Sequence, residues 1–148
     1  ECEEKGLSFE EVVSEVEKYI EEMNTFFVLE NLETLRKNGR LGRVKALVAS
    51  ALKIKPVMGA TPEGTICQLD QARGMNKALV RMVDSIVEKV VNPDETVIAI
   101  SHCNCPERAR QVRDMIREKC PAIGEIIMTP TSALSSMYAN DGGIVIAY

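Results

Sequence analysis

The run Thr96-Val97-Ile98-Ala99-Ile100-Ser101 has the continuous apolar composition of a buried β-strand, and it decides the fold. It is followed by His102-Cys103-Asn104-Cys105 and then by Pro106, a residue that helices accept at their first position. The helix that starts there is expected to end before Pro121. A strand, a short loop and a helix in this order predict a β-loop-α unit of an α/β domain.

Helical and strand patterns alternate along the rest of the chain, which predicts a layered, mixed α/β domain. Ser8-x-x-Glu11 is a capping-box pattern, and the apolar residues after it predict an amphipathic helix over residues 8–23. The clearest helical period covers residues 75–90. Proline cannot donate to a strand pair, so Pro56 favours an edge or terminal position for its strand. The remaining predictions are short helices over 32–37 and 44–52, strands over 25–29, 54–58, 65–69, 124–128 and 143–148, and a loop over 129–142.

Composition indicates one compact domain. The chain has 148 residues, of which 45% are hydrophobic and 27% charged, and a net charge of −4. No apolar run approaches the roughly 18 residues of a membrane span, and the acidic start Glu1-Cys2-Glu3 is unlike a signal peptide, so we expect a cytoplasmic protein. The five cysteines are scattered and odd in number, which favours reduced thiols.

Charge divides the first third of the chain. Eleven of the 22 acidic residues lie between Glu1 and Glu33, and none lies between Thr34 and Pro62. The acid-free stretch holds seven of the 18 basic residues: Arg36, Lys37, Arg40, Arg43, Lys45, Lys53 and Lys55. Such a segment is either a solvated basic face or a regulatory or nucleic-acid-contacting surface. The overall acidic balance and the absence of Trp argue against nucleic acid as a partner.

Two candidates for chemistry follow the strand that ends at Ser101. His102 is the one histidine, at the end of a strand where α/β sheets often place sites, but a capping or backbone-bonded imidazole is an equal alternative. Zinc is not expected at His102-Cys103-x-Cys105, because there is no second ligand cluster. The two cysteines precede a helix N-terminus, which lowers thiol pKa values, although inert loop thiols are the simpler interpretation. We therefore expect no enzyme activity and no metal.

Two further segments are suited to polar recognition. Gly39-Arg40-Leu41-Gly42-Arg43 lacks both nucleotide-binding glycine patterns, but its guanidinium groups could hold a carboxylate or phosphate. The stretch 129–143 is rich in Ser and Thr hydroxyls, as a head-group site requires and as ordinary surface turns also are.

Several spaced residues resemble the second domain of the DegV family. They are Leu32-x-x-Leu35-x-x-x-Gly39-Arg40-Leu41, Lys45-Ala46-x-x-x-Ser50-x-Leu52-x-Ile54-Lys55-Pro56-Val57, Gly64 and Gln71-Ala72-Arg73. The long helix, the apolar strand ending in a histidine and the closing Gly-rich segment before a last strand are also similar. The resemblance implies a mixed, largely antiparallel sheet flanked by helices. It divides the chain into an N-terminal helix over 1–24, which leads into a lipid-binding domain over 25–148.

The resemblance implies a non-enzymatic carrier that holds a long-chain fatty acid, without any cofactor, between two domains. In many members of the family the acyl carboxylate is presented to a fatty acid kinase subunit. No counterpart of the family's first domain lies in this sequence, so we expect that missing N-terminal domain as a partner. A dry apolar lining suits an acyl chain, and the candidates, each also a normal core residue, are Leu47, Val48, Ala51, Leu52, Met115 and Met137.

The resemblance also assigns the polar residues. Arg40 matches the family's Gly-Arg element near the head group, and Arg73 matches a basic surface position that would face the kinase. Many members have Gly-Thr-His-x-Gly-Pro-Gly before the last strand, and their histidine meets the carboxylate. Tyr138 stands at that position here, where it can donate a hydrogen bond but is neutral near pH 7. The Ser135 and Ser136 hydroxyls complete the predicted polar end.

Overall fold

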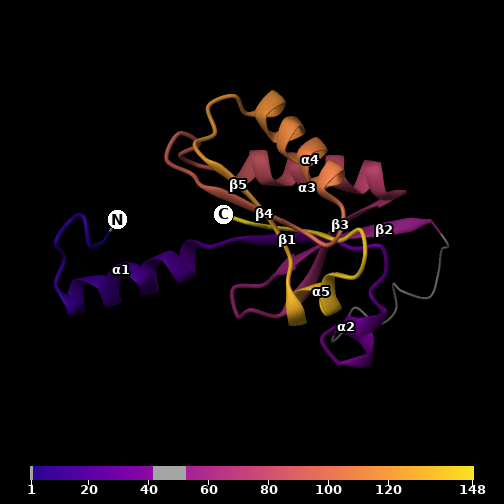
Figure 1. Cartoon of the computed structure of the whole chain (residues 1–148), viewed down its shortest axis with the longest axis horizontal. Coiled ribbons are helices and arrows are strands. Elements are labelled where there is room, and N and C mark those ends of the chain that lie inside the picture. Colours follow the sequence, from indigo (N-terminus) through magenta and orange to yellow (C-terminus); the bar gives the residue numbers. More distant parts are fainter. Residues whose placement is uncertain (1, 42–52) are drawn as a thin grey trace.

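A computed structural model describes residues 2–41 and 53–148 of the chain. Within these residues six strands form one sheet in the order β3-β2-β1-β6-β4-β5 (Figure 1). The strands are β1 (Thr25–Val28), β2 (Ile54–Ala60), β3 (Ile66–Arg73), β4 (Ile98–His102), β5 (Ile126–Pro130) and β6 (Ile144–Ala147).

Antiparallel pairing dominates this sheet. Strand β1 pairs antiparallel with β2 and β6, and the β2–β3 and β4–β6 pairs are also antiparallel. Strand β5 pairs parallel with β4, as expected for the β-loop-α unit at this end of the sheet. The predicted class, a mixed α/β domain with a largely antiparallel sheet, is confirmed.

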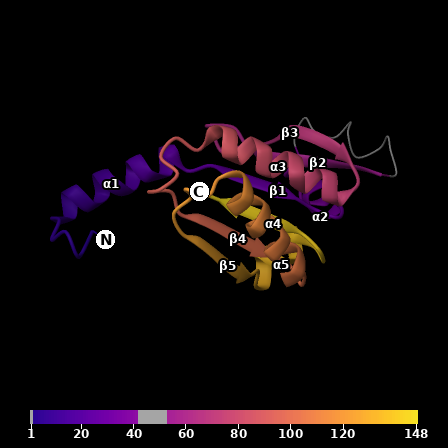
Figure 2. The same cartoon turned by 90° about the horizontal axis from the view of Figure 1, so that it is seen from above.

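Helices α3 and α4 lie side by side over one face of the sheet (Figures 1 and 2). Helix α1 extends away from the layers, and α2 and α5 lie on the opposite side of the sheet from α3 and α4 (Figure 1). The helices are α1 (Phe9–Glu22), α2 (Glu33–Lys37), α3 (Met75–Lys89), α4 (Pro106–Lys119) and α5 (Ala133–Ala139). The helix predicted over residues 44–52 lies outside the described residues.

The main core fills the space between the sheet and the α3–α4 pair. Alternate residues of the central strands point to this side, including Phe26, Ile100 and Ile146, none of which is more than 1% exposed. Helix α3 adds a continuous apolar face, and its buried residues are Ala78, Leu79, Met82, Val83 and Ile86. The period of the helix and the alternation of the strands therefore produce one continuous core.

The predicted helix start at Ser8 is confirmed. The Glu11 backbone N–H donates to Ser8 Oγ at 3.4 Å, and the Ser8 N–H donates to Glu11 Oε2 at 2.8 Å, which completes the capping box. Pro106 likewise occupies the first turn of α4, as its missing N–H allows.

The prediction of a loop over residues 129–142 is wrong in its centre, where α5 forms. This helix has seven residues and buries only Ala139, so the sequence carries almost no helical period there. Asn140, which has a φ of +56°, ends the helix.

Pro56 does not make β2 an edge strand, because β2 pairs with both β1 and β3. The pairs with β1 are Phe26 with Gly59 and Phe27 with Met58, whereas Pro56 pairs with Gln71 of β3. Pro56 thus lies beyond the part of β2 that is paired on both sides, where a missing N–H is tolerated.

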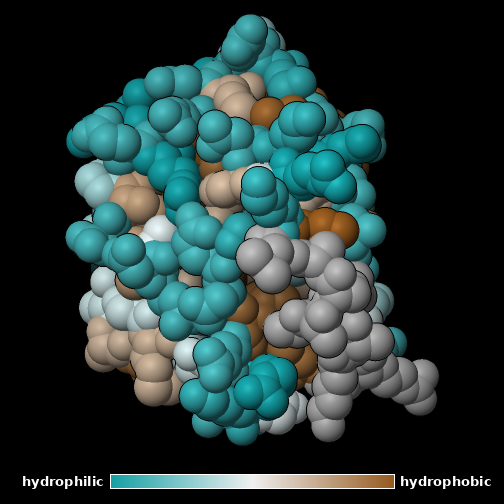
Figure 3. All heavy atoms as spheres, turned by 90° about the vertical axis from the view of Figure 1, so that its right-hand side faces the viewer, coloured by the Kyte–Doolittle hydropathy of each residue, from teal (hydrophilic) through white to brown (hydrophobic). Residues whose placement is uncertain are grey.

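Hydrophilic atoms dominate the upper, helical part of the face shown in Figure 3, and hydrophobic atoms gather lower on that face. None of the helices within residues 2–41 and 53–148 has the length and apolar character required to cross a bilayer.

Shortening a side chain at the centre of the main core tests this packing. Ile146 is fully buried, so we expect Ile146→Ala to lower the free energy of unfolding by about 2–5 kcal/mol. Val91 is 87% exposed, so Val91→Ala is expected to change it by no more than about 0.5 kcal/mol. Urea unfolding followed by circular dichroism measures both, and equal effects would contradict the described core.

Candidate functional site

The described residues cover the second face of the sheet only in part. Residues that alternate with the main core point to it, among them Phe27 of β1, Met58 of β2 and Val145 of β6. Helices α2 and α5 contact each other over this face, and Thr34 Oγ1 donates to Asn140 Oδ1 at 3.3 Å between them. The buried members of this smaller cluster are Phe27, Leu29, Leu32, Leu35, Leu41, Met58 and Ala139.

A pocket of about 580 Å³ lies on this face beside α5. Its larger apolar lining residues are Phe27, Leu29, Leu35, Ile66, Leu134 and Val145. Its hydroxyl-bearing lining residues are Thr25, Ser101, Thr131, Ser132, Ser135 and Tyr138. An apolar cavity with a few convergent polar groups is the usual form of a small-molecule site.

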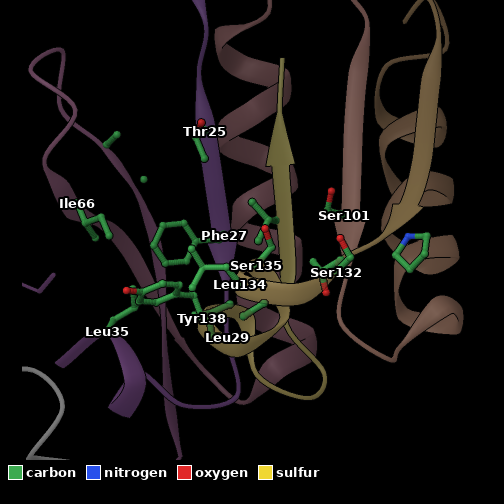
Figure 4. A pocket seen from close by; sticks show the side chains of 16 residues that line it. Thr25, Phe27, Leu29, Leu35, Ile66, Ser101, Ser132, Leu134, Ser135 and Tyr138 are labelled. Carbon is green, nitrogen blue, oxygen red and sulfur yellow. The ribbon is translucent and has the colours of Figure 1, made fainter. Parts of the chain in front are cut away.

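The polar groups are unevenly placed in the pocket. Figure 4 shows Ser101 and Ser132 together on the side of β4, and Ile66 and Leu35 on the opposite side. The Tyr138 ring lies close to Leu35, with its hydroxyl directed away from the two serines (Figure 4). The pocket therefore has one end with serine hydroxyls and a more apolar end that holds the Tyr138 phenol, while Thr25 lies apart from the serines on β1.

The turn between α5 and β6 holds the pocket wall against the sheet. A Cβ at Gly143 would lie 2.3 Å from the Ala139 carbonyl oxygen, so only glycine allows this approach of helix and strand. The Gly142 N–H donates to the Cys103 carbonyl at 2.8 Å, and the Cys103 N–H donates to the Gly143 carbonyl at 3.0 Å. These bonds tie the turn to the end of β4.

Glu30 stands at the centre of a charged cluster that supports the same turn. Its carboxylate pairs with Lys55 Nζ at 2.8 Å and with Arg108 Nη2 at 2.9 Å. Arg108 also donates to the Gly142 carbonyl. Burial acts to raise the pKa of Glu30, but the hydrogen bonds and charges of Lys55 and Arg108 together outweigh it, so the pKa lies below its usual value.

The structure brings together two of the residues predicted for the site, Ser135 and Tyr138, which both line the pocket. Ser136 is outside the lining, but its hydroxyl shares a 2.9 Å hydrogen bond with the hydroxyl of Thr131, which is in it. Met137 is 49% exposed and is not a lining residue.

The other predicted residues do not line the described pocket. Arg40 is exposed just after α2, and Arg73 is exposed at the end of β3. Leu47 and Ala51, like Val48 and Leu52, lie outside the described residues. Met115 packs on the main core, on the other side of the sheet.

Sequence reasoning missed most of the pocket wall. The predicted strands contain Phe27 and Val145, but the prediction does not say which face of the sheet these side chains occupy. Alternation with their buried neighbours places both on the second face. Ser101 ends the predicted buried strand, and alternation with Ile100 of the main core places it on the second face, in the pocket.

Several basic side chains of the stretch 36–55 are already paired. Lys37 lies 3.0 Å and Arg36 3.9 Å from the Glu33 carboxylate, and Lys55 is bound to Glu30. These pairs reduce the positive field that a nucleic-acid surface requires, while Arg43 and Lys45 of the same stretch lie outside the described residues.

The two thiols that follow β4 face backbone carbonyls. Cys103 Sγ faces the Ser136 carbonyl at 3.8 Å, and Cys105 Sγ faces the Gly143 carbonyl at 3.5 Å. Burial raises the pKa of Cys105 despite the nearby Arg108 charge, so a lowered pKa at the start of the helix is wrong for this thiol. In the described part of the chain, no three His, Cys, Asp or Glu side chains are grouped to hold a metal ion.

A family profile described as "Uncharacterised protein, DegV family" matches residues 1–148. The chain belongs to the DegV family. The predicted resemblance is thus confirmed. A DegV domain-containing protein of Streptococcus gordonii is 37% identical over 143 residues, which are 97% of this chain and 50% of that protein.

Solved DegV structures share this fold. A Ruminococcus gnavus DegV family protein, solved with vaccenic acid, is 54% identical, with a TM-score of 0.94 over 99% of this chain and 52% of that one. The Streptococcus pneumoniae fatty acid kinase (Fak) B3 protein, loaded with linoleic acid, is 35% identical, with a TM-score of 0.87 over 99% of this chain and 51% of that one. The chain spans about half the length of the DegV relatives that it matches.

The Glu30 cluster makes stability depend on pH. Because the folded pKa of Glu30 is lowered, its contribution is complete above the ordinary value of 4.5 and is lost as the pH falls through the folded pKa. We expect Glu30→Gln to be less stable than the unmodified chain at pH 7, and the difference to shrink below pH 4.5. Urea unfolding from pH 3 to pH 8 measures this. The exposed Glu88 serves as a control: Glu88→Gln should show no such trend, and a pH-independent effect of Glu30→Gln would refute the charge interaction.

Proposed function

We propose that this chain is one half of a DegV fatty-acid carrier, with a lipid-binding domain over residues 25–148 and a helix over 1–24 that leads into it. The observation that carries the proposal is the pocket on the second face of the sheet, which is apolar at one end and hydroxyl-lined at the other. The two solved relatives described above were loaded with unsaturated long-chain fatty acids.

The apolar wall suits an acyl chain. Each buried methylene contributes about 0.8 kcal/mol, so the walls formed by Phe27, Leu35 and Ile66 supply binding energy without directional contacts. Leu134, on the rim, is 64% exposed and would be covered by such a ligand.

The serine hydroxyls suit the carboxylate. Ser101, Ser132 and Ser135 each offer an O–H donor, and a carboxylate accepts several such bonds. None of the described lining residues is Lys, Arg or His, so these hydroxyls leave the charge of the head group unbalanced. We assign that balance to the other half of the carrier, and we place Tyr138 near the acyl chain as a neutral donor. The Arg40 N–H donates to the Leu35 carbonyl at 2.8 Å, so Arg40 lies by the apolar end, and its predicted head-group role requires the carboxylate to lie at that end instead.

The carrier would present its ligand to a fatty acid kinase in the cytoplasm and would perform no chemistry itself. The relative from S. pneumoniae carries fatty acid kinase in its name. Arg73 is the candidate contact with the kinase, because it is basic, exposed and outside the pocket.

The experiment that tests the function uses a chimera in which this chain replaces the matching half of the R. gnavus protein. Purification without detergent and mass spectrometry of extracted lipids should show about one fatty acid per chimera. The R. gnavus protein is the positive control. A folded chimera that carries no fatty acid, and takes up none from added vaccenic acid, would refute the proposal.

Removing one hydroxyl tests the head-group end. A hydrogen bond to a charged group contributes about 1.5–3 kcal/mol, so Ser135→Ala in the chimera should weaken vaccenic acid binding by about tenfold or more. Ser14→Ala, on the exposed surface of α1, is the matched control and should leave affinity unchanged. Equal affinities for the two variants would remove Ser135 from the site.

Arg40 has its own test. With the carboxylate at the serine end, as proposed, we expect Arg40→Ala in the chimera to leave the retained fatty acid unchanged; with the carboxylate at the Leu35 end, the loss of this positive charge reduces it. Arg36→Ala removes a neighbouring guanidinium that is paired with Glu33, and should leave retention unchanged. A loss of fatty acid in Arg40→Ala alone would contradict a head group at the serine end and support the predicted role of Arg40.

A further inference from the structure

We propose that the apolar face of α1 is a docking surface for the half of a DegV protein that this chain does not match. We call this face the α1 stripe. It consists of Phe9, Val13, Val16, Tyr19, Ile20 and Met23, which recur at helical spacing. The proposal stands independently of fatty-acid binding.

The α1 stripe is exposed in the described chain. Phe9 is 77%, Tyr19 61% and Ile20 60% exposed, and α1 has no buried residue. A continuous row of large apolar side chains on a soluble domain marks an interaction site.

The helix also depends on packing for its stability. Fourteen residues is a marginal length for an isolated helix in water. The last turn of α1 has no basic residue and carries Glu21 and Glu22, whose charges are unfavourable at the negative end of the helix dipole. Local support comes from the capping box at Ser8, from the acidic first-turn residues Glu10 and Glu11, and from the Asn24 side chain, which donates to the Glu22 carbonyl at 2.9 Å. None of these buries the apolar stripe, so a body that covers it would add the packing that stabilises most helices in proteins.

The sheet fixes where α1 leaves the domain. The Asn24 N–H donates to the Tyr148 carbonyl at 2.7 Å, and the Tyr148 N–H donates to the Asn24 carbonyl at 3.1 Å. From this anchor α1 extends beyond the edge of the α3–α4 layer in both views (Figures 1 and 2). It is thereby presented to a second body.

A second copy of this chain is a poor occupant. By helical spacing Glu10 and Glu17 flank one side of the stripe, and Glu15 and Glu22 flank the other. Two such stripes packed face to face would bring glutamates against glutamates, and like charges at an interface are repulsive. The flanking glutamates therefore favour a partner surface with an apolar centre and a neutral or basic rim.

The R. gnavus protein indicates which body this is. The superposition covers 99% of this chain with a TM-score of 0.94, so α1 is included, and it covers only 52% of the R. gnavus chain. The rest of that protein is a body of nearly the same size as this chain, attached to the same fold. We therefore assign the α1 stripe to it.

The test compares the chain alone with the R. gnavus chimera described above. Ile20→Glu adds one negative charge on the stripe, and Ser14→Glu adds the same charge on the polar face of α1. We expect Ile20→Glu to lower the melting temperature of the chimera by about 5 °C or more and Ser14→Glu to leave it unchanged. In the chain alone both variants should have equally small effects, because α1 is not packed there. Hydrogen exchange should show α1 amides protected in the chimera and open in the chain alone.

Three results would overturn the proposal. The first is a chimera whose melting temperature falls no further with Ile20→Glu than with Ser14→Glu. The second is a difference between the two variants that is as large in the chain alone as in the chimera. The third is a dimer of the chain in sedimentation that Ile20→Glu dissociates, which would identify a second copy as the occupant. If the chimera does not fold, the same pair of changes is made at the aligned positions of the R. gnavus protein, and its melting temperature tests the proposal in the same way. Lipid content is measured separately, so a packed α1 in an empty chimera would refute fatty-acid binding and support the docking surface.

Discussion

The sheet has apolar side chains on both faces of its central strands, and the rest of the structure depends on how those faces are covered. Phe26 and Phe27 are neighbours in β1, yet they belong to two different hydrophobic clusters. One face is covered fully by α3 and α4, which leaves Ile100 and Ile146 without solvent contact. Of the helices within residues 2–41 and 53–148, the short α2 and α5 lie over the other face. The pocket is the part of that face which these helices leave uncovered, so the site follows directly from the unequal layers.

The short helix α5 requires its own support, because seven residues cannot hold a wall in place by helical propensity. That support comes from the turn that follows it. Gly143 allows the helix to approach β6 closely, and the backbone bonds of Gly142 and Gly143 to Cys103 tie the turn to β4. Arg108 then joins this turn to Glu30, which follows β1 in the chain. The pocket wall formed by α5 is thus tied to the centre of the sheet by contacts from distant parts of the sequence.

The elements with strong periods could be predicted from the sequence, and α3, the strand around Ile100 and the capping box at Ser8 were. Helix α5 could not, because a single buried residue leaves no period. This error explains the mixed outcome for the predicted site. A loop groups Ser135 to Tyr138 as neighbours, whereas a helix turns successive residues by about 100°, so Ser135 and Tyr138 share the pocket side while Met137 faces solvent. The pocket wall also needs β6 to lie between β1 and β4, and no local pattern reports this strand order. The resemblance to DegV proteins supplied the sheet type that periodicity alone could not.

The pocket and the α1 stripe are both apolar surfaces that the described chain leaves to solvent, and one second body would explain both. A pocket lined by serine hydroxyls but by no described cation holds a carboxylate only weakly, because the charge of the head group is then unbalanced. A body anchored along α1 could supply both the missing charge and the missing wall. Division of a lipid site between two bodies has a physical advantage for a carrier. Interfaces between domains of one chain open more readily than a packed core, so a ligand can enter and leave without local unfolding of either half. A cavity enclosed wholly within the core under α3 and α4, whose central residues have no solvent contact, would not allow such exchange.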